Sequence, residues 1–182
     1  WKVPKGDKTG FTLYNSITKE KNDLLYSSPN DKLLTWYSCG PTVYDHSHIG
    51  HARCYVQQDI VLRILRHFQV DVQFVMGLTD IDDKIIGKAK TLDVSNVNGV
   101  SSILPVQQIA KEYENSFWED MDTLQVIRPH AITRVSEHMH SITEMVNKLV
   151  QEEFAYIAKD GSVYFDTGRY RKYVAEHPIP SP

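Results

Sequence analysis

The chain has 182 residues, which suits one domain with a substantial core and is short for a multidomain enzyme. Its 20 basic and 23 acidic residues give a net charge of −3, and the basic residues are too scattered to force nucleic-acid binding by bulk electrostatics. No apolar run approaches the roughly 20 residues of a membrane helix, and Cys39 and Cys54 are too few for a disulfide framework, so we expect no membrane span and a reducing compartment.

The first predicted elements are strands. β-type residues on both sides of a polar turn in residues 11–25, FTLYNSITKEKNDLL, predict a small strand or hairpin. Residues 33–39, LLTWYSC, form a short apolar run bounded by a polar segment and by Gly-Pro, which is typical of a buried strand.

A helix and a second strand follow. Apolar residues at three- and four-residue spacing over 50–68 predict a helix with a broad buried face, made of Val56, Ile60, Ile64, Val61, Leu65 and Phe68. Residues 70–76 alternate apolar and polar side chains, as a strand does. Strand, helix and strand in about 45 residues predict a βαβ unit with parallel strands, and therefore an α/β fold.

The rest of the chain predicts further helices and one hairpin. An acidic start predicts a helix within residues 77–90, and the polar residues 91–104 predict a surface connection. A helix is expected from Pro105, with Val106, Ile109, Tyr113, Phe117 and Met121 on one face, and another from Thr133, with Val135, Met139, Ile142, Val146 and Leu149. Residues 155–166 predict a hairpin around Asp160-Gly161, and the tail after Tyr173 has no core pattern.

Candidate binding residues lie between the first core strand and its helix. In an open α/β sheet, ligands bind at the carboxyl ends of the strands, where helix N-termini attract phosphate. His48 and His51 flank Gly50, which lets a backbone or a purine ring approach closely. These histidines could donate hydrogen bonds to nucleotide phosphates, or they could simply belong to a solvated loop.

Two further features allow more than one interpretation. Cys39 at the end of the strand is either a small core residue or a metal ligand, and local spacing does not define a zinc site. Asp80, Asp82 and Asp83 follow the second core strand and could hold Mg²⁺, bind an amino group or cap a helix. Capping explains one of them, either Asp80 or Asp82.

Taken together, the motifs resemble the cysteine–tRNA ligases, which are class I aminoacyl-tRNA synthetases. Residues 39–53, CGPTVYDHSHIGHAR, are similar to the family's first signature with its HIGH element, and residues 78–85, LTDIDDKI, to the second. Weaker similarity continues through residues 117–124 and 133–139 and through the hairpin, so the resemblance extends to about Tyr173.

The resemblance implies a Rossmann-like parallel sheet of the HUP nucleotide-binding type and a two-step reaction. Cysteine and ATP, with Mg²⁺, would form cysteinyl-adenylate, and the cysteine would then pass to tRNA(Cys). His48 and His51 would serve as catalytic residues at the phosphates. The same resemblance places Gly50 under the adenine, Gly40, Pro41 and Thr42 at the pocket floor, Thr79 near the substrate cysteine, and Cys39 as a Zn²⁺ ligand that favours a thiolate over a hydroxyl.

The sequence also departs from the family pattern. It contains no KMSKS or WHxEC motif, and the expected Tyr-Gly after the hairpin is Tyr173-Val174. We therefore expect residues 1–104 to be the first half of the catalytic domain, 105–173 a connective helical and hairpin region that forms part of an insertion, and 174–182 a proline-rich tail. Such a truncated chain should be inactive alone, with tRNA bound through regions it lacks.

Location and function retain alternatives. Met76-Gly77 resembles the animal mitochondrial form of the family, which suggests the mitochondrial matrix, with the cytoplasm as the alternative. The alternatives to the tRNA ligase are a non-catalytic half-fold that binds or regulates a partner, a cysteine ligase that acts on a small amine acceptor, and a simple nucleotidylyltransferase, against which the two signatures argue.

Overall fold

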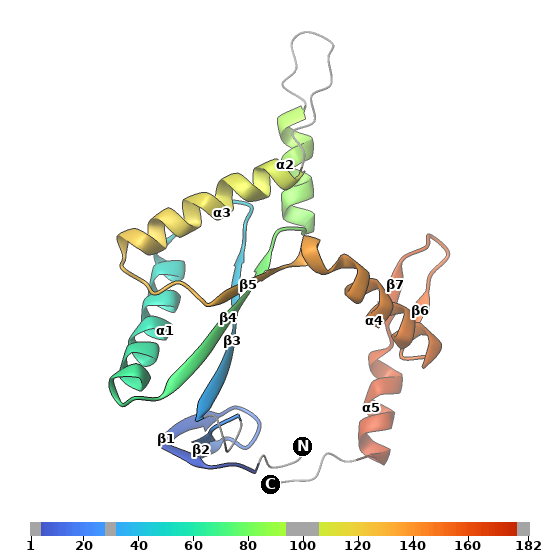
Figure 1. Cartoon of the computed structure of the whole chain (residues 1–182). Helices are drawn as coiled ribbons and strands as arrows, with labels where there is room; N and C mark the ends of the chain where they lie inside the picture. The colour runs from blue at the N-terminus through green and yellow to red at the C-terminus, as the bar shows by residue number, and fades with distance from the viewer. Residues whose placement is uncertain (1–4, 28–31, 94–105, 178–182) are drawn as a thin grey trace. The chain divides into compact units, whose positions relative to one another are not determined.

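The structure is a computed structural model that describes residues 5–27, 32–93 and 106–177 (Figure 1). It divides into two compact units, one of Tyr26–Glu137 and one that combines Trp1–Leu25 with His138–Pro182. The elements in chain order are β1 (Lys8–Asn15), β2 (Glu20–Leu25), β3 (Leu33–Thr42), α1 (Ile49–His67), β4 (Asp71–Thr79), α2 (Asp83–Asp93), α3 (Val106–Thr123), β5 (Ala131–Arg134), η1 (Val135–His138), α4 (Met139–Gln151), β6 (Ala155–Ile157), β7 (Val163–Phe165) and α5 (Thr167–Glu176).

The unit of residues 26–137 is built on a parallel sheet in the order β3-β4-β5. Helix α1 makes the crossover between β3 and β4, so the predicted βαβ unit and the α/β fold class are confirmed. Strand β3 runs three residues beyond the predicted end, through Gly40 and Pro41 to Thr42. Pairing loses its regular register between Cys39 and Thr42, where Pro41 has no N–H to give to the ladder.

The core lies on one face of this sheet. Val72, Phe74, Met76 and Leu78 of β4 are all buried, as the alternation of the strand predicts. Beyond the strand ends the core continues through Val43, Ile85, Ala89, Ile109 and Ala110. The carboxyl end of α3 approaches α1 (Figure 1), and the ring of Tyr55 meets that of Phe117 edge to face at 5.1 Å.

The buried face of α1 differs from the expected one. Of the six residues predicted to face the core, Leu65 is buried, but Ile60, Ile64 and Phe68 are 50%, 45% and 62% exposed. The helix instead buries Tyr55, Asp59, Leu62 and Leu65. The prediction was wrong because a carboxylate was counted as a surface residue. Asp59 accepts hydrogen bonds from Arg63 Nε at 2.6 Å and from the backbone N–H of Ile127 at 2.9 Å, so its burial is compensated.

The helix predicted from Thr133 begins later than expected. Residues 131–134 form β5, residues 135–138 form the 3₁₀ helix η1, and α4 starts at Met139. No residue of α4 is buried, although Met139, Ile142, Val146 and Leu149 keep the predicted helical spacing. The sequence pattern missed β5 because residues 131–134 form a strand only by pairing with β4, where Val75 lies opposite Ala131 and Leu78 opposite Arg134.

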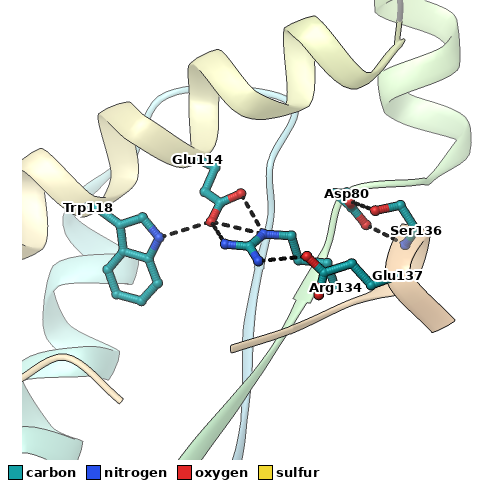
Figure 2. Close-up of polar contacts among 6 residues, drawn as sticks. All are labelled: Asp80, Glu114, Trp118, Arg134, Ser136 and Glu137. Atoms are coloured by element: carbon teal, nitrogen blue, oxygen red, sulfur yellow. Dashed lines mark hydrogen bonds and ion pairs between the residues drawn. The ribbon is translucent and has the colours of Figure 1, made fainter. Parts of the chain in front are cut away.

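Polar contacts hold β5 in place (Figure 2). Arg134 donates three hydrogen bonds to the carboxylate of Glu114 on α3, from Nη2 at 2.6 Å and from Nε at 3.0 Å and 3.2 Å. Trp118 Nε1 donates to the same carboxylate at 3.2 Å. Hydrogen bonding to Glu114 raises the pKa of Arg134 above its ordinary value. Next to this cluster, Asp80 accepts from the backbone N–H of Ser136 at 2.9 Å and from the Ser136 hydroxyl.

The remaining elements largely follow the prediction. β1 and β2 form the expected antiparallel hairpin, and β6 and β7 form the second around Gly161, whose φ of 84° suits a glycine. Residues 91–93, expected in a surface connection, are helical at the end of α2, and α5, capped by Asp166, was not predicted. Pro105, residues 94–104 and residues 178–182 lie outside the described part. No helix in the described ranges is long and apolar enough to cross a membrane.

We expect Asp59→Ala to lower the free energy of unfolding by about 1–3 kcal/mol, because it leaves the Ile127 N–H and the Nε–H of Arg63 without their acceptor. Urea denaturation followed by circular dichroism measures the change. Asp122→Ala is the matched control, since Asp122 also binds an arginine, Arg128, but at an exposed site. Equal losses in the two variants would contradict a special role for the buried carboxylate.

Candidate functional site

The strand ends bring three of the predicted site residues to one edge of the sheet. Cys39 pairs with Gly77, and Thr42 pairs with Thr79, whose carbonyl accepts the N–H of Val43 at 3.1 Å. Thr42 and Thr79 are therefore direct neighbours at the ends of the two strands. The Cys39 side chain is exposed, so the alternative of a small core residue is wrong.

Gly40 is required by the packing of β3 against β4. A Cβ at this position would lie 2.6 Å from the carbonyl oxygen of Gly77 and 2.9 Å from Cγ of Met76. Neither the strand backbone nor a buried methionine can easily move away, so a larger residue would push the two strands apart. At Gly40, which was predicted to lie at a pocket floor, the two strands are therefore in contact through backbone.

The two predicted catalytic histidines lie together at the N-terminus of α1. His48 is the N-cap: its Nδ1 accepts the N–H of Gly50 at 3.0 Å. His51 completes a capping box, because its Nδ1 accepts the N–H of His48 at 3.1 Å. The ring centroids are 4.1 Å apart. A Cβ on Gly50 would lie 2.7 Å from Cε1 of His48, so glycine lets this ring fold back over the helix end.

The capping box fixes which nitrogen of each ring carries the proton. A nitrogen that accepts a hydrogen bond carries no hydrogen, so the neutral rings of His48 and His51 carry theirs on Nε2. Burial and the neighbouring His48 lower the pKa of His51 below its ordinary value, which favours this neutral form. Two Nε2–H donors therefore sit beside the positive end of the α1 dipole, an arrangement suited to phosphate.

The structure gives each of the three aspartates after β4 a different role. Asp80 is bound to Ser136 and is only 9% exposed. Asp82 caps α2, since its Oδ1 accepts the N–H of Lys84 at 2.9 Å, as one of the proposed roles predicts. Asp83 lies in the first turn of α2, where the helix dipole stabilises a negative charge. Asp80 and Asp82 are thus engaged by protein groups.

Cys39 is the one residue predicted to bind Zn²⁺, and its side chain is exposed. Among the residues that the structure describes, no group of three His, Cys, Asp or Glu side chains converges on a point where a metal ion could bind. Cys39 offers one exposed soft sulfur, which fits Zn²⁺ as a single ligand but does not make a four-coordinate site. No step of the chemistry below is therefore routed through zinc.

The two histidines and the residues at the strand ends are not joined directly. No hydrogen bond within the described ranges joins His48 or His51 to Cys39, Thr42 or Thr79. A cavity of about 550 Å³ lies at the amino ends of β3 and β4, where Leu33 and Asp71 line it, so it is away from the predicted site. Sequence analysis missed Lys88 of α2, whose Nζ donates to the Tyr44 carbonyl in the β3–α1 loop at 2.9 Å. No motif marks this lysine.

The lowered pKa of His51 predicts a pH effect. Its folded-state pKa lies below 6.5, so the residue contributes stability above about pH 6.5, and this contribution is lost as the pH falls through the folded-state pKa. We expect the Hε1 resonance of His51 to titrate with a midpoint below 6.5 in NMR. His51→Gln retains a capping acceptor without titrating, so its stability should fall less between about pH 7 and pH 5. A midpoint at or above 6.5 would refute the prediction.

Comparison with known proteins identifies the family. Residues 25–178 match the family described as "tRNA synthetases class I (C) catalytic domain". The chain is 44% identical over 174 residues to "Cysteine--tRNA ligase, cytoplasmic" of Dictyostelium discoideum, covering 94% of this chain and 25% of that protein. It is 42% identical over 178 residues to "Probable cysteine--tRNA ligase, mitochondrial" of Xenopus tropicalis, covering 95% and 29%.

A third relative is also similar to this chain over most of the chain's length. "Cysteine--tRNA ligase" of Methanococcus aeolicus is 42% identical over 161 residues, which is 88% of this chain and 31% of that protein. The chain thus spans between a quarter and a third of the length of these relatives, and their names include both cytoplasmic and mitochondrial proteins. By the match over residues 25–178 and by these identities, the chain belongs to the class I cysteine–tRNA ligase family.

Proposed function

We propose that this chain forms the ATP- and cysteine-binding half of a cysteine–tRNA ligase catalytic domain. The observation that carries the proposal is the capping box of His48 and His51, which leaves two imidazole Nε2–H donors at the N-terminus of α1, next in the chain to the carboxyl end of β3. The relatives named as cysteine–tRNA ligases support the choice of amino acid and of tRNA.

In this proposal each site residue has a distinct role. His48 and His51 donate hydrogen bonds to the phosphates of ATP, and the α1 dipole adds to their effect. Gly50 lies under the adenine. Gly40 keeps the backbone floor open, and Thr42 and Thr79, paired at the strand ends, contact the substrate cysteine.

The reaction would follow in two balanced steps. A carboxylate oxygen of cysteine attacks the α-phosphate of ATP, the bond to the β-phosphate breaks, and pyrophosphate leaves. Mg²⁺, when bound, would neutralise part of the phosphate charge. A hydroxyl of the terminal ribose of tRNA(Cys) then attacks the activated carbonyl, and AMP leaves. The histidine donors stabilise the charge that grows on the α-phosphate, while tRNA binds through parts of the ligase that this chain lacks. Cys39 would contribute one thiolate to a zinc ion, which supplies selectivity for the substrate thiol.

We expect the double variant His48→Asn and His51→Gln to bind ATP at least about tenfold more weakly than the wild-type chain, because the remaining amide N–H groups do not lie where the two imidazole Nε2–H donors do. Asn is a good N-cap and Gln at N3 retains the capping box, so the thermal stability should change little. Isothermal titration calorimetry with ATP measures the affinity. Phe68→Ser, an exposed position at the other end of α1, is the control and should bind normally.

Two results would contradict the proposal. If the wild-type chain does not bind ATP at millimolar concentration, the nucleotide half-site does not exist in this chain. If the double variant binds as well as the wild type, the histidines do not contact the nucleotide. Such a result would favour the alternative of a non-catalytic half-fold that acts by binding a partner.

We further propose that this stretch binds substrates but does not turn them over by itself. It spans 25% to 31% of the length of the relatives, so most of each relative has no counterpart in this stretch. Cysteine-dependent exchange of pyrophosphate into ATP should therefore stay at the level of a blank without protein. Exchange above the blank would show that the chain is an active enzyme on its own and would open the way to tests of small amine acceptors.

For location we propose the mitochondrial matrix. The proposal rests on the resemblance of Met76-Gly77 to the mitochondrial form of the family. Immunofluorescence of the native protein against a mitochondrial marker tests it, and a diffuse cytoplasmic signal would overturn it.

A further inference from the structure

The loop between β3 and α1 carries His48, and helices α2 and α3 hold almost every residue of it. At its start, Val43 is 1% exposed and belongs to the core. Tyr44 packs against that core, with Nζ of Lys84 4.9 Å from its ring centroid. His46 contacts α3 twice: its Nδ1 lies 2.9 Å from Oγ of Ser116, and its ring meets that of Tyr113 edge to face at 5.1 Å.

Lys88 is the centre of these contacts. Its Nζ donates to the carbonyl of Tyr44 at 2.9 Å and to the hydroxyl of Tyr113 at 2.6 Å, and it lies 3.5 Å from the carboxylate of Asp45. The ammonium also lies 4.0 Å from the ring centroid of Tyr113, a cation–π contact. One charged group of α2 thereby joins two loop residues to α3.

The charges in this cluster support one another. Loss of hydration opposes the charge on Lys88, but the hydrogen bond and charge contact with Tyr113, together with Asp45, raise its pKa above the ordinary value. The N–H of His46 and the charge of Lys88 lower the pKa of Asp45. Lys88 is thus a cation over the whole physiological range, and its three partners have fixed places.

The capping box alone does not orient the histidines relative to the sheet. It ties His48 and His51 to the first turn of α1, whereas Thr42 and Thr79 belong to the ends of β3 and β4. The link between the two groups is the loop of residues 43–47. Its course therefore decides how the Nε2–H donors face the strand ends, and a displacement of about 1 Å is enough to harm a catalytic geometry.

We propose that Lys88 is a positioning residue that fixes the β3–α1 loop and thereby sets the orientation of His48 and His51 toward a nucleotide. The inference rests on the proposed function, since it deepens the account of the same site. Lys88 has no hydrogen bond or ion pair with His48 or His51 among the described residues, so it acts through Tyr44, Asp45 and Tyr113.

The test compares Lys88→Met, Lys88→Arg and the control Lys84→Met in the 182-residue chain. Lys84 is the control because it also lies next to Tyr44 but contacts only its ring. We expect Lys88→Met to weaken ATP binding about tenfold in calorimetry, in line with loss of a charge-assisted hydrogen-bond cluster. Lys88→Arg should restore binding to within about threefold, and Lys84→Met should bind like the wild type.

A second readout does not depend on ATP. The NMR titration of His51 reports its local environment in the folded chain, and general destabilisation does not move it. We expect the His51 midpoint to rise toward 6.5 in Lys88→Met and to stay low in Lys88→Arg, because a loosened loop exposes the ring. Amide hydrogen exchange at Gly50 and His51 should quicken in Lys88→Met alone.

The outcomes separate the inference from the function. If the wild-type chain binds no ATP, the proposed function fails, but the His51 titration still decides whether Lys88 positions the histidines. If the chain binds ATP and Lys88→Met changes neither the affinity nor the His51 midpoint, the inference is overturned. It is also overturned if Lys88→Arg behaves like Lys88→Met in a chain that remains folded.

Discussion

The parallel pairing of β3 with β4 is the constraint on which the functional edge depends. It starts at Leu33 and Asp71 and ends at Thr42 and Thr79, so two residues far apart in the sequence become neighbours. The strands approach so closely at Gly40 that the Gly77 carbonyl occupies the space of a Cβ. Pro41, which lacks an N–H, coincides with the break in register. The Gly-Pro pair thus coincides with the end of the regular ladder, next to the paired Thr42 and Thr79.

The two histidines combine a structural and a chemical role. A helix N-terminus has N–H groups without partners, and the Nδ1 atoms of His48 and His51 satisfy two of the donors there. The same bonds keep the Nε2–H donors available. Serine or aspartate would cap the helix as well but would leave no second donor or would add a negative charge. Capping alone therefore does not require histidine at both positions, whereas the proposed contact with phosphate would account for it.

Local signals in the sequence predicted most elements. The alternation in β4 and the Asp160-Gly161 turn are properties of a few neighbouring residues, and the structure confirms what they indicated. The Gly-Pro pair after Cys39 was expected to end the strand, but β3 continues through it to Thr42. The site residues were also local, since His48, Gly50 and His51 follow one another at the start of a helix. What the sequence could not show is a contact between distant segments: the β3–α1 loop depends on Lys88, which is 40 or more residues further along the chain and belongs to no motif.

The missed features share a physical cause, which is the burial of charged groups that a pattern treats as exposed. Asp59 lies on the buried face of α1, where a pattern would place an apolar residue, and it binds the N–H of Ile127. Glu114 binds Arg134 of β5, and Asp80 binds Ser136 directly after that strand. Each carboxylate meets a donor on a segment without apolar periodicity, so together they specify a strand that no local signal marks. A buried carboxylate with satisfied partners and a catalytic carboxylate look the same in a sequence. Only the position of the donors distinguishes the two kinds of carboxylate. For Asp80 the donors are the backbone N–H and the hydroxyl of Ser136. Asp80 therefore stabilises the sheet that carries Thr79 at its edge.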